Sequence, residues 1–205
     1  MIFCILKCLY MFSDFWFNVK LGLFHVLDWN AYDHILFLIA LVAAYSFSEG
    51  KRVIWLVTIF TIGHTISLTL AAYKVFQIDS AWIEFFIPVS ILFSAIYNII
   101  FAGKNIAKQK LNALYAFTLF FGLIHGFGFS SYFNMVSLSA ESKLLMLVEF
   151  ALGVELAQIL IVIPVLILSF FVQNILRYSK KDWILISCSI VVGLCIPLLK
   201  ETWIW

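Results

Sequence analysis

The chain has 205 residues, of which 64% are hydrophobic and 12% are charged, and its formal net charge is +2. A soluble domain carries about a quarter charged residues, so this composition excludes an ordinary soluble protein and indicates an integral membrane protein. The expected surroundings are membrane lipid, and the small net charge gives no reason to expect a nucleic-acid partner.

The N-terminal region is apolar in two short stretches, residues 1–13 and 15–27. Each is shorter than the roughly 20 residues that cross a bilayer, and Lys7 interrupts the first. The absence of a small-residue cleavage site argues against a cleaved signal peptide. We therefore expect an amphipathic or re-entrant segment at the outer interface, with Met11 as an alternative start to Met1.

Later segments are long and apolar enough to form membrane helices. The expected fold class is all-α, a polytopic membrane helical bundle that forms a single transmembrane domain over residues 1–205. The connections are too short to hold a soluble domain. Six transmembrane helices are predicted, with these ranges: 31–47, 53–75, 83–102, 113–133, 145–173 and 183–199.

Basic residues gather in alternate connections. The connections 48–52, 103–112 and 174–182 hold eight of them, whereas 76–82 and 134–144 together hold only Lys143. The positive-inside rule places the three basic connections in the cytoplasm. We therefore expect a bacterial cytoplasmic (inner) membrane protein with its C-terminus outside. The cysteines, which form no C-x-x-C pair, are expected to be buried and unpaired: Cys4, Cys8, Cys188 and Cys195.

All four histidines fall in or beside predicted membrane segments, and an ionisable residue inside a bilayer is a functional hypothesis. In the predicted orientation these histidines and several carboxylates share the outer half of the membrane. Imidazole together with carboxylate suits a divalent transition metal such as nickel, cobalt or zinc. The candidate metal ligands are His25, Asp33, His34, His64, His125 and Glu155.

Further polar residues stand at helical spacing from these ligands or from one another. Ser90, Ser94 and Asn98 form a stripe on one face of a predicted helix, although such stripes also hold membrane helices together. Asp28 could instead cap the loop that follows it. The candidate supporting residues are Asp28, Ser67, Glu84, Ser90, Asn98 and Gln158.

Several ordered motifs resemble the HupE/UreJ family of hydrogenase and urease accessory membrane proteins, which are regarded as nickel permeases. The resemblance lies in "FHVLDWNAYDHILFLIAL" with His25, Asp33 and His34, in "FTIGHTISLTL", in "FGLIHGFGF" and in "FALGVELAQ". It implies a membrane bundle and nickel- or cobalt-type transport. The chain departs from the family pattern at three places: seven residues instead of five precede Asp33 after His25, Phe121 stands where nickel permeases have a histidine, and Ala151 stands where an asparagine is common.

Three functions remain open at this point. The first is a metal transporter that captures the ion at His25, Asp33 and His34 and passes it inward. The second is an intramembrane hydrolase, in which a zinc ion held by three histidines activates water beside Asp33 or Glu155. The third is a non-catalytic subunit of a membrane complex. A transporter needs polar groups toward the cytoplasm, where the sequence offers mainly Thr58, Ser94 and Asn98.

Overall fold

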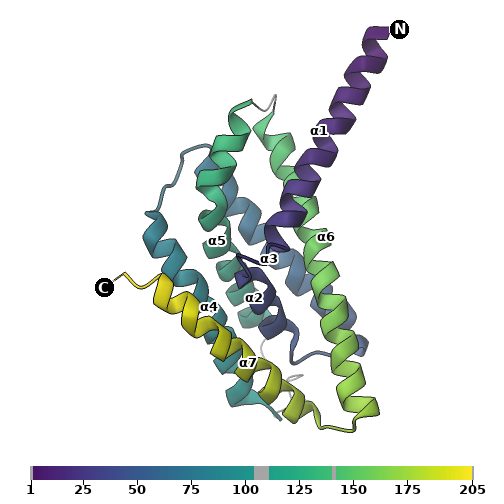
Figure 1. The fold of residues 1–205 in the computed structure, drawn as a ribbon, viewed down its shortest axis with the longest axis vertical. Coiled ribbons are helices and arrows are strands. Elements are labelled where there is room, and N and C mark those ends of the chain that lie inside the picture. Colours follow the sequence, from purple (N-terminus) through teal and green to yellow (C-terminus); the bar gives the residue numbers. More distant parts are fainter. Residues whose placement is uncertain (1, 104–110, 140–141, 205) are drawn as a thin grey trace.

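The computed structural model describes residues 2–103, 111–139 and 142–204, and within these ranges it contains helices and no strands. The helices pack side by side along one long axis (Figure 1). In chain order they are α1 (Ile2–Val26), α2 (Asp33–Val42), the 3-10 turn η1 (Phe47–Glu49), α3 (Gly50–Ala72), α4 (Ser80–Phe101), α5 (Leu111–Val136), η3 (Ser137–Ser139), α6 (Lys143–Phe170), the π-helical turn η4 (Phe171–Ile175) and α7 (Lys180–Glu201). The predicted helical bundle is confirmed.

Among the described residues, five helical stretches are long and apolar enough to cross a membrane. They are Phe47–Ala72, Ser80–Phe101, Ala113–Val136, Lys143–Ile175 and Lys180–Glu201. The prediction of six full spans is wrong at residues 31–47. Helix α2 has 10 residues, about 15 Å of helix, or roughly half of a 30 Å hydrocarbon core.

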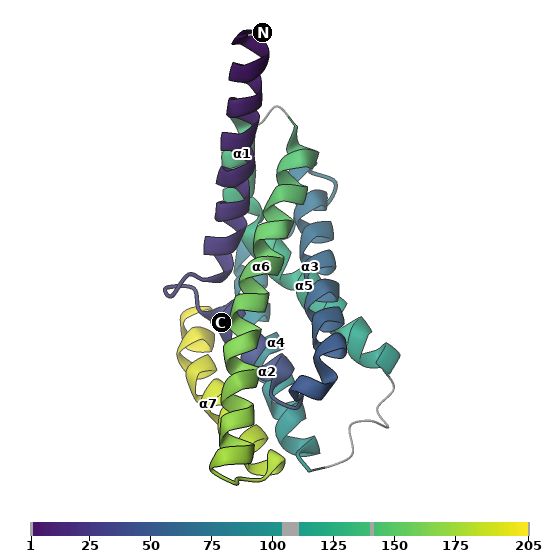
Figure 2. The same ribbon diagram turned by 90° about the vertical axis from the view of Figure 1, so that its right-hand side faces the viewer.

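The N-terminal region is one continuous helix of 25 residues, not two short apolar stretches. The chain has no glycine or proline between residues 2 and 21, so nothing in the backbone forces a break there. The expectation of a separate amphipathic or re-entrant segment is therefore corrected to a long helix. Beyond the body of the bundle, the N-terminal part of α1 extends freely (Figure 2).

Helices α1 and α2 follow one another along the long axis, with a short turn between them. Helix α1 descends to the middle of the molecule, and α2 lies below its end in both views (Figures 1 and 2). In the turn, the Asp28 carboxylate accepts a hydrogen bond from the backbone N–H of Asn30 at 2.9 Å. The pair resembles a membrane helix broken near its middle, an arrangement that exposes two helix ends inside a bundle.

Two helix pairs approach closely because glycines face the backbone of the neighbouring helix. A Cβ added to Gly63, Gly122 or Gly126 would clash with backbone atoms across the contact between α3 and α5. Gly22 on α1 and Gly153 on α6 make the corresponding close contact on the other side. Small residues allow such approaches in membrane bundles, and here they bring α1 against α6 and α3 against α5.

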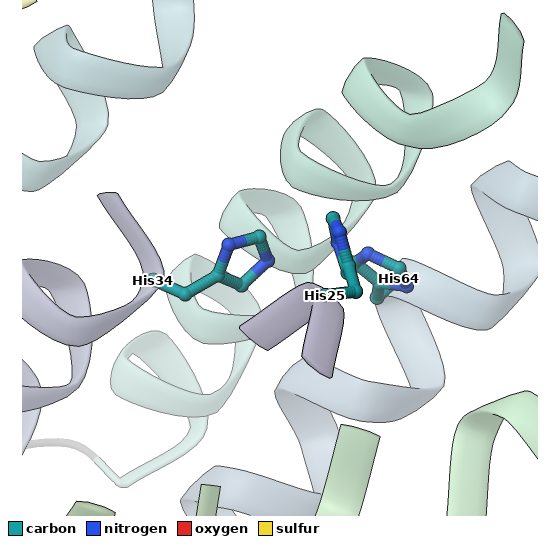
Figure 3. A group of neighbouring side chains, drawn as sticks. All are labelled: His25, His34 and His64. Atoms are coloured by element: carbon teal, nitrogen blue, oxygen red, sulfur yellow. The ribbon is translucent and has the colours of Figure 1, made fainter. Parts of the chain in front are cut away.

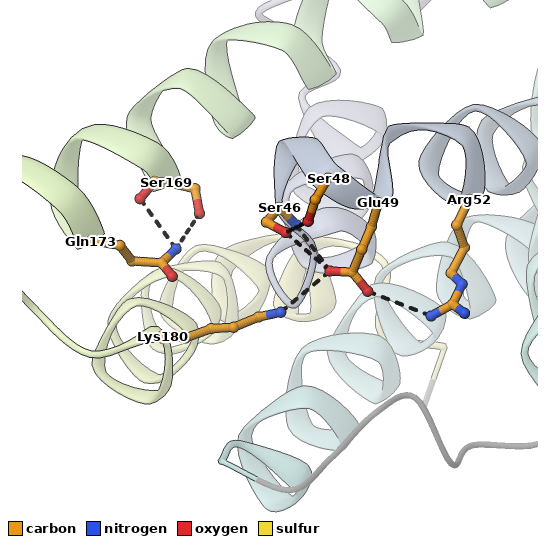
Figure 4. Close-up of polar contacts among 7 residues, drawn as sticks. All are labelled: Ser46, Ser48, Glu49, Arg52, Ser169, Gln173 and Lys180. Atoms are coloured by element: carbon orange, nitrogen blue, oxygen red, sulfur yellow. Dashed lines mark hydrogen bonds and ion pairs between the residues drawn. The ribbon is translucent and has the colours of Figure 1, made fainter.

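Two of the basic connections lie side by side, with Arg52 in one and Lys180 in the other (Figure 4). Glu49 lies 3.5 Å from the guanidinium of Arg52 and 3.4 Å from Nζ of Lys180, so the connections before α3 and before α7 are neighbours. Nearby, Gln173 donates a hydrogen bond of 2.7 Å to Oγ of Ser169. The lysines predicted between α4 and α5, at positions 104, 108 and 110, lie outside the described residues.

Two of the cysteines behave as predicted. Cys188 and Cys195 on α7 are buried and free. The side chains of Cys4 and Cys8 lie outside the described part of the chain.

Candidate metal centre

Three histidines from three different helices converge at the break between α1 and α2. His25 is the last residue but one of α1, His34 is the second residue of α2, and His64 lies near the middle of α3. One ring nitrogen of each lies within 4.8 Å of the others, and Figure 3 shows the rings turned toward a common space. The break in the first span therefore delivers two of the three imidazoles.

Most ring nitrogens of this group make no hydrogen bond within the described residues. His25 Nε2 and both nitrogens of His34 and of His64 are buried without a hydrogen bond. Nδ1 of His34 lies 3.5 Å from Oδ1 of Asp33. Buried polar atoms in proteins are nearly always paired, so this concentration of unpaired ring nitrogens is the feature that makes the group a candidate ligand site.

Aromatic rings hold the imidazoles in place. The His25 ring lies 3.9 Å from the ring of Phe129, and the His64 ring stacks on Phe150 at 6.0 Å. Phe60 contacts His34 at 6.2 Å, edge to face. Packed neighbours restrict ring rotation and so preorganise the three nitrogens.

His125 on α5 joins the edge of this group. Its ring centroid lies 5.1 Å from that of His34. Its Nδ1 lies 2.9 Å from the carbonyl oxygen of Phe121, while its Nε2 is buried without a partner. A hydrogen bond from Nδ1–H to the carbonyl leaves the lone pair on Nε2 for a ligand. The sequence named all four histidines as candidate ligands; the structure groups His25, His34 and His64 and places His125 beside His34.

A cavity of about 540 Å³ borders the histidines, and it carries three carboxylates. Asp33 stands beside His34, and Asp28 and Glu84 are exposed at the lining, so the cavity reaches the molecular surface. His25, His34 and His125 line it as well. Such a space holds several waters, and its acidic groups would attract a cation toward the imidazoles.

Of the comparisons with known proteins, the one with protein families gave a match. The HupE / UreJ protein family matches residues 8–201, nearly the whole chain.

The chain belongs to the HupE/UreJ family. It is a multi-pass membrane protein of that family by its matched length and its apolar helices. The comparisons with curated proteins and with solved structures gave no significant match.

Within this HupE/UreJ protein, Glu155 stands apart from the three-histidine group. Its Oε1 accepts a hydrogen bond from Thr58 at 2.7 Å, and its Oε2 contacts the hydroxyl of Thr61. Both threonines are on α3, which means that the carboxylate fastens α6 to α3. The sequence did not reveal this pairing, because the partners are more than 90 residues apart.

The remaining predicted residues mostly bind backbone atoms. Ser67 donates to the carbonyl of His64 at 3.0 Å, and Ser90 donates to that of Ile87 at 2.7 Å. Asn98 donates to the carbonyl of Ala40 at 2.6 Å, which links α4 to α2. Gln158 is fully buried, and neither polar atom of its side chain has a partner.

One further contact was absent from the sequence interpretation. The amide of Asn18 on α1 donates to Glu149 on α6 at 2.7 Å. Glu149 is buried, so this bond satisfies a carboxylate inside the α1–α6 contact. No spacing rule joins two residues so distant in the chain.

Aromatic residues below the histidines were also overlooked as parts of the site. Phe60 precedes His64 by four residues, and Phe121 precedes His125 by four. Residues four apart share one helix face, which is a signal that the sequence did contain. Phe37 stacks on Phe60 with centroids 4.8 Å apart and lies 5.3 Å from His125.

Proposed function

We propose that this protein binds a divalent transition-metal cation of the nickel or cobalt type and carries it across the membrane. The observation that supports the proposal most directly is the group His25, His34 and His64, whose buried nitrogens lie within 4.8 Å of one another. Imidazole nitrogens suit nickel, cobalt and zinc, whereas magnesium and calcium prefer oxygen ligands. Family membership supports the same class of cargo.

In this proposal the carboxylates of the cavity act before the imidazoles. Asp28 and Glu84 are exposed at its lining and would concentrate cations there. Asp33 lies 3.5 Å from His34, so it would either complete the coordination or orient that ring. The nearby Nε2 of His125 is the other protein atom available for a fourth ligand.

The proposed orientation follows the charges. The end of the bundle with Arg52 and Lys180 would face the cytoplasm, and the carboxylate-lined cavity would then open to the outside of a bacterial inner membrane. The C-terminus, after α7, would also lie outside.

The test is metal uptake by the purified protein in proteoliposomes, followed with a trapped metal-sensitive dye. We expect nickel or cobalt uptake by the unmodified chain and its loss in His64→Ala. Cys195→Ala, which changes a buried side chain on α7, serves as the matched control and should keep uptake. Uptake by folded His64→Ala equal to that of the control would contradict the proposal.

A second candidate rests on the same cavity. Three histidines beside an open space that holds several waters resemble a catalytic zinc site, with Asp33 as the base. The serine considered for such chemistry, Ser67, is fully buried and bonded to its own helix. A hydrolase would retain its metal without moving it, so the uptake assay separates the two functions. A non-catalytic subunit would do neither.

A further inference from the structure

A second, smaller cavity of about 210 Å³ lies farther along the bundle. Its polar lining comes from Tyr45, Ser94, Tyr97, Asn98 and Thr118, and none of the described residues that line it is charged, in contrast to the carboxylate-lined outer cavity. Its remaining walls are mostly aromatic and aliphatic. The polar groups that the described residues bring to this inner cavity are therefore neutral hydroxyls and an amide.

The two cavities are aligned along the same three helices. On α5 the outer cavity is lined from His125 to Tyr132, and the inner one from Ala113 to Phe121. On α2 and α4 as well, one part of the helix lines the outer cavity and another part, farther along the bundle in the same direction, lines the inner cavity. The inner cavity thus lies toward the end that carries the basic residues.

Two phenylalanines stand between the cavities. Phe37 on α2 is fully buried, and its ring meets that of Phe121 edge to face at 5.9 Å. Phe121 lines the inner cavity, and His125, four residues later, lines the outer one. Four residues of helix span about 6 Å, so the barrier is about one helical turn thick.

Polar groups continue past this barrier on α4. Ser90, Ser94 and Asn98 stand at successive four-residue steps, and the last two line the inner cavity. Ser90 lies between Ile87, which lines the outer cavity, and Phe93, which lines the inner one. The stripe that first suggested helix–helix contact also runs from one cavity to the other.

We propose that the inner cavity is a second binding site for the same divalent cation, taken up with part of its water shell through hydroxyl and amide oxygens. Phe37 and Phe121 close this site off from the histidine centre. The proposal rests on the proposed transport function. Neutral oxygen ligands hold such ions more weakly than imidazoles do, and a transport path must release its ion at the exit.

The test is the accessibility of Ser94→Cys, which is half-buried in the inner cavity. The background carries alanine at all four native cysteines. A membrane-impermeant thiol reagent is applied to either face of oriented vesicles. We expect reaction only from the face with the basic connections, and reaction from both faces once Phe121→Ala is added. Phe121→Leu, which keeps an apolar side chain, should retain one-sided access.

The cation assignment is tested in the same assay with cobalt chloride as the probe. Cobalt should slow labelling of Ser94→Cys at least threefold and should leave Ile190→Cys, on the exposed face of α7, as unreactive as before. Labelling from both faces with Phe121 present, no labelling from either, or no protection by cobalt would overturn the inference. If Ser94→Cys is labelled from one face and protected by cobalt as expected, but the protein takes up no metal in proteoliposomes, the proposed transport function is overturned instead.

Discussion

The rings of His25 and His34 meet edge to face with their centroids 4.7 Å apart, although one lies in the last turn of α1 and the other in the first turn of α2. A continuous helix would carry these two residues about 13 Å apart along its axis. The turn between α1 and α2 therefore brings together two of the three imidazoles of the candidate metal centre. Shortening or straightening that turn would separate two ligands.

The first prediction concerns His34. We expect His34→Ala to weaken nickel, cobalt or zinc binding by at least about 100-fold, because even indirect partners of a metal ligand typically contribute 10–100-fold. Calorimetric titration of detergent-purified protein measures it. Cys188→Ala, buried on α7, is the control and should bind as the unmodified chain does. A folded His34→Ala protein with unchanged affinity would remove His34 from the ligand set.

The second prediction concerns Glu155, which the sequence analysis counted among the ligands. Because its carboxylate is held by Thr58 and Thr61, we expect Glu155→Gln to change metal affinity by less than about threefold. Stability should fall instead, by about 1–3 kcal/mol, since a charged acceptor between two helices is lost. Thermal unfolding in detergent and metal titration measure the two effects. A large loss of affinity would return Glu155 to the metal site.

The third prediction concerns the contact between α3 and α5. A Cβ at Gly122 would clash with the backbone of Phe60, so Gly122→Ala should destabilise the protein by about 1–3 kcal/mol and weaken metal binding by displacing His64. Gly193→Ala is the matched control, because that position has open space around it. It should be neutral or slightly stabilising in a helix. Equal unfolding temperatures for the two variants would show that this contact does not require glycine.

The fourth prediction concerns orientation. The positive-inside rule places the connection 103–112 in the cytoplasm and the connection 134–144 outside. The structure offers exposed residues at both ends of the bundle for testing this orientation. In the cysteine-free background, Tyr178→Cys should react with an impermeant thiol reagent from the cytoplasmic face and Val75→Cys from the outer face; both side chains are exposed. The reverse pattern would invert the orientation and the direction of transport with it.

The helices after residue 50 could be predicted from the sequence because long apolar blocks leave the backbone few alternatives in a bilayer. The break between α1 and α2 could not. Apolar composition reports burial and does not report helix continuity, and Lys7 suggested an interruption where the helix in fact continues.

The candidate site, like the fold, could be predicted from the sequence only in part. The sequence identified His25, His34 and His64 from their chemistry, but their convergence depends on glycine contacts between α1 and α6 and between α3 and α5. The packing of these helices therefore decides which histidines lie close together. The barrier formed by Phe37 and Phe121 escaped notice because an aromatic residue in a membrane helix is unremarkable until cavities are found on both sides of it.

The most direct test of the central claim is X-ray absorption spectroscopy of the purified protein loaded with one equivalent of nickel, cobalt or zinc. Three imidazole ligands should appear at about 2.0–2.1 Å, the usual metal–nitrogen distance for zinc. His64→Ala should reduce that number to two. A metal held only by oxygen ligands, or an unchanged number of imidazoles in His64→Ala, would contradict a centre built from His25, His34 and His64.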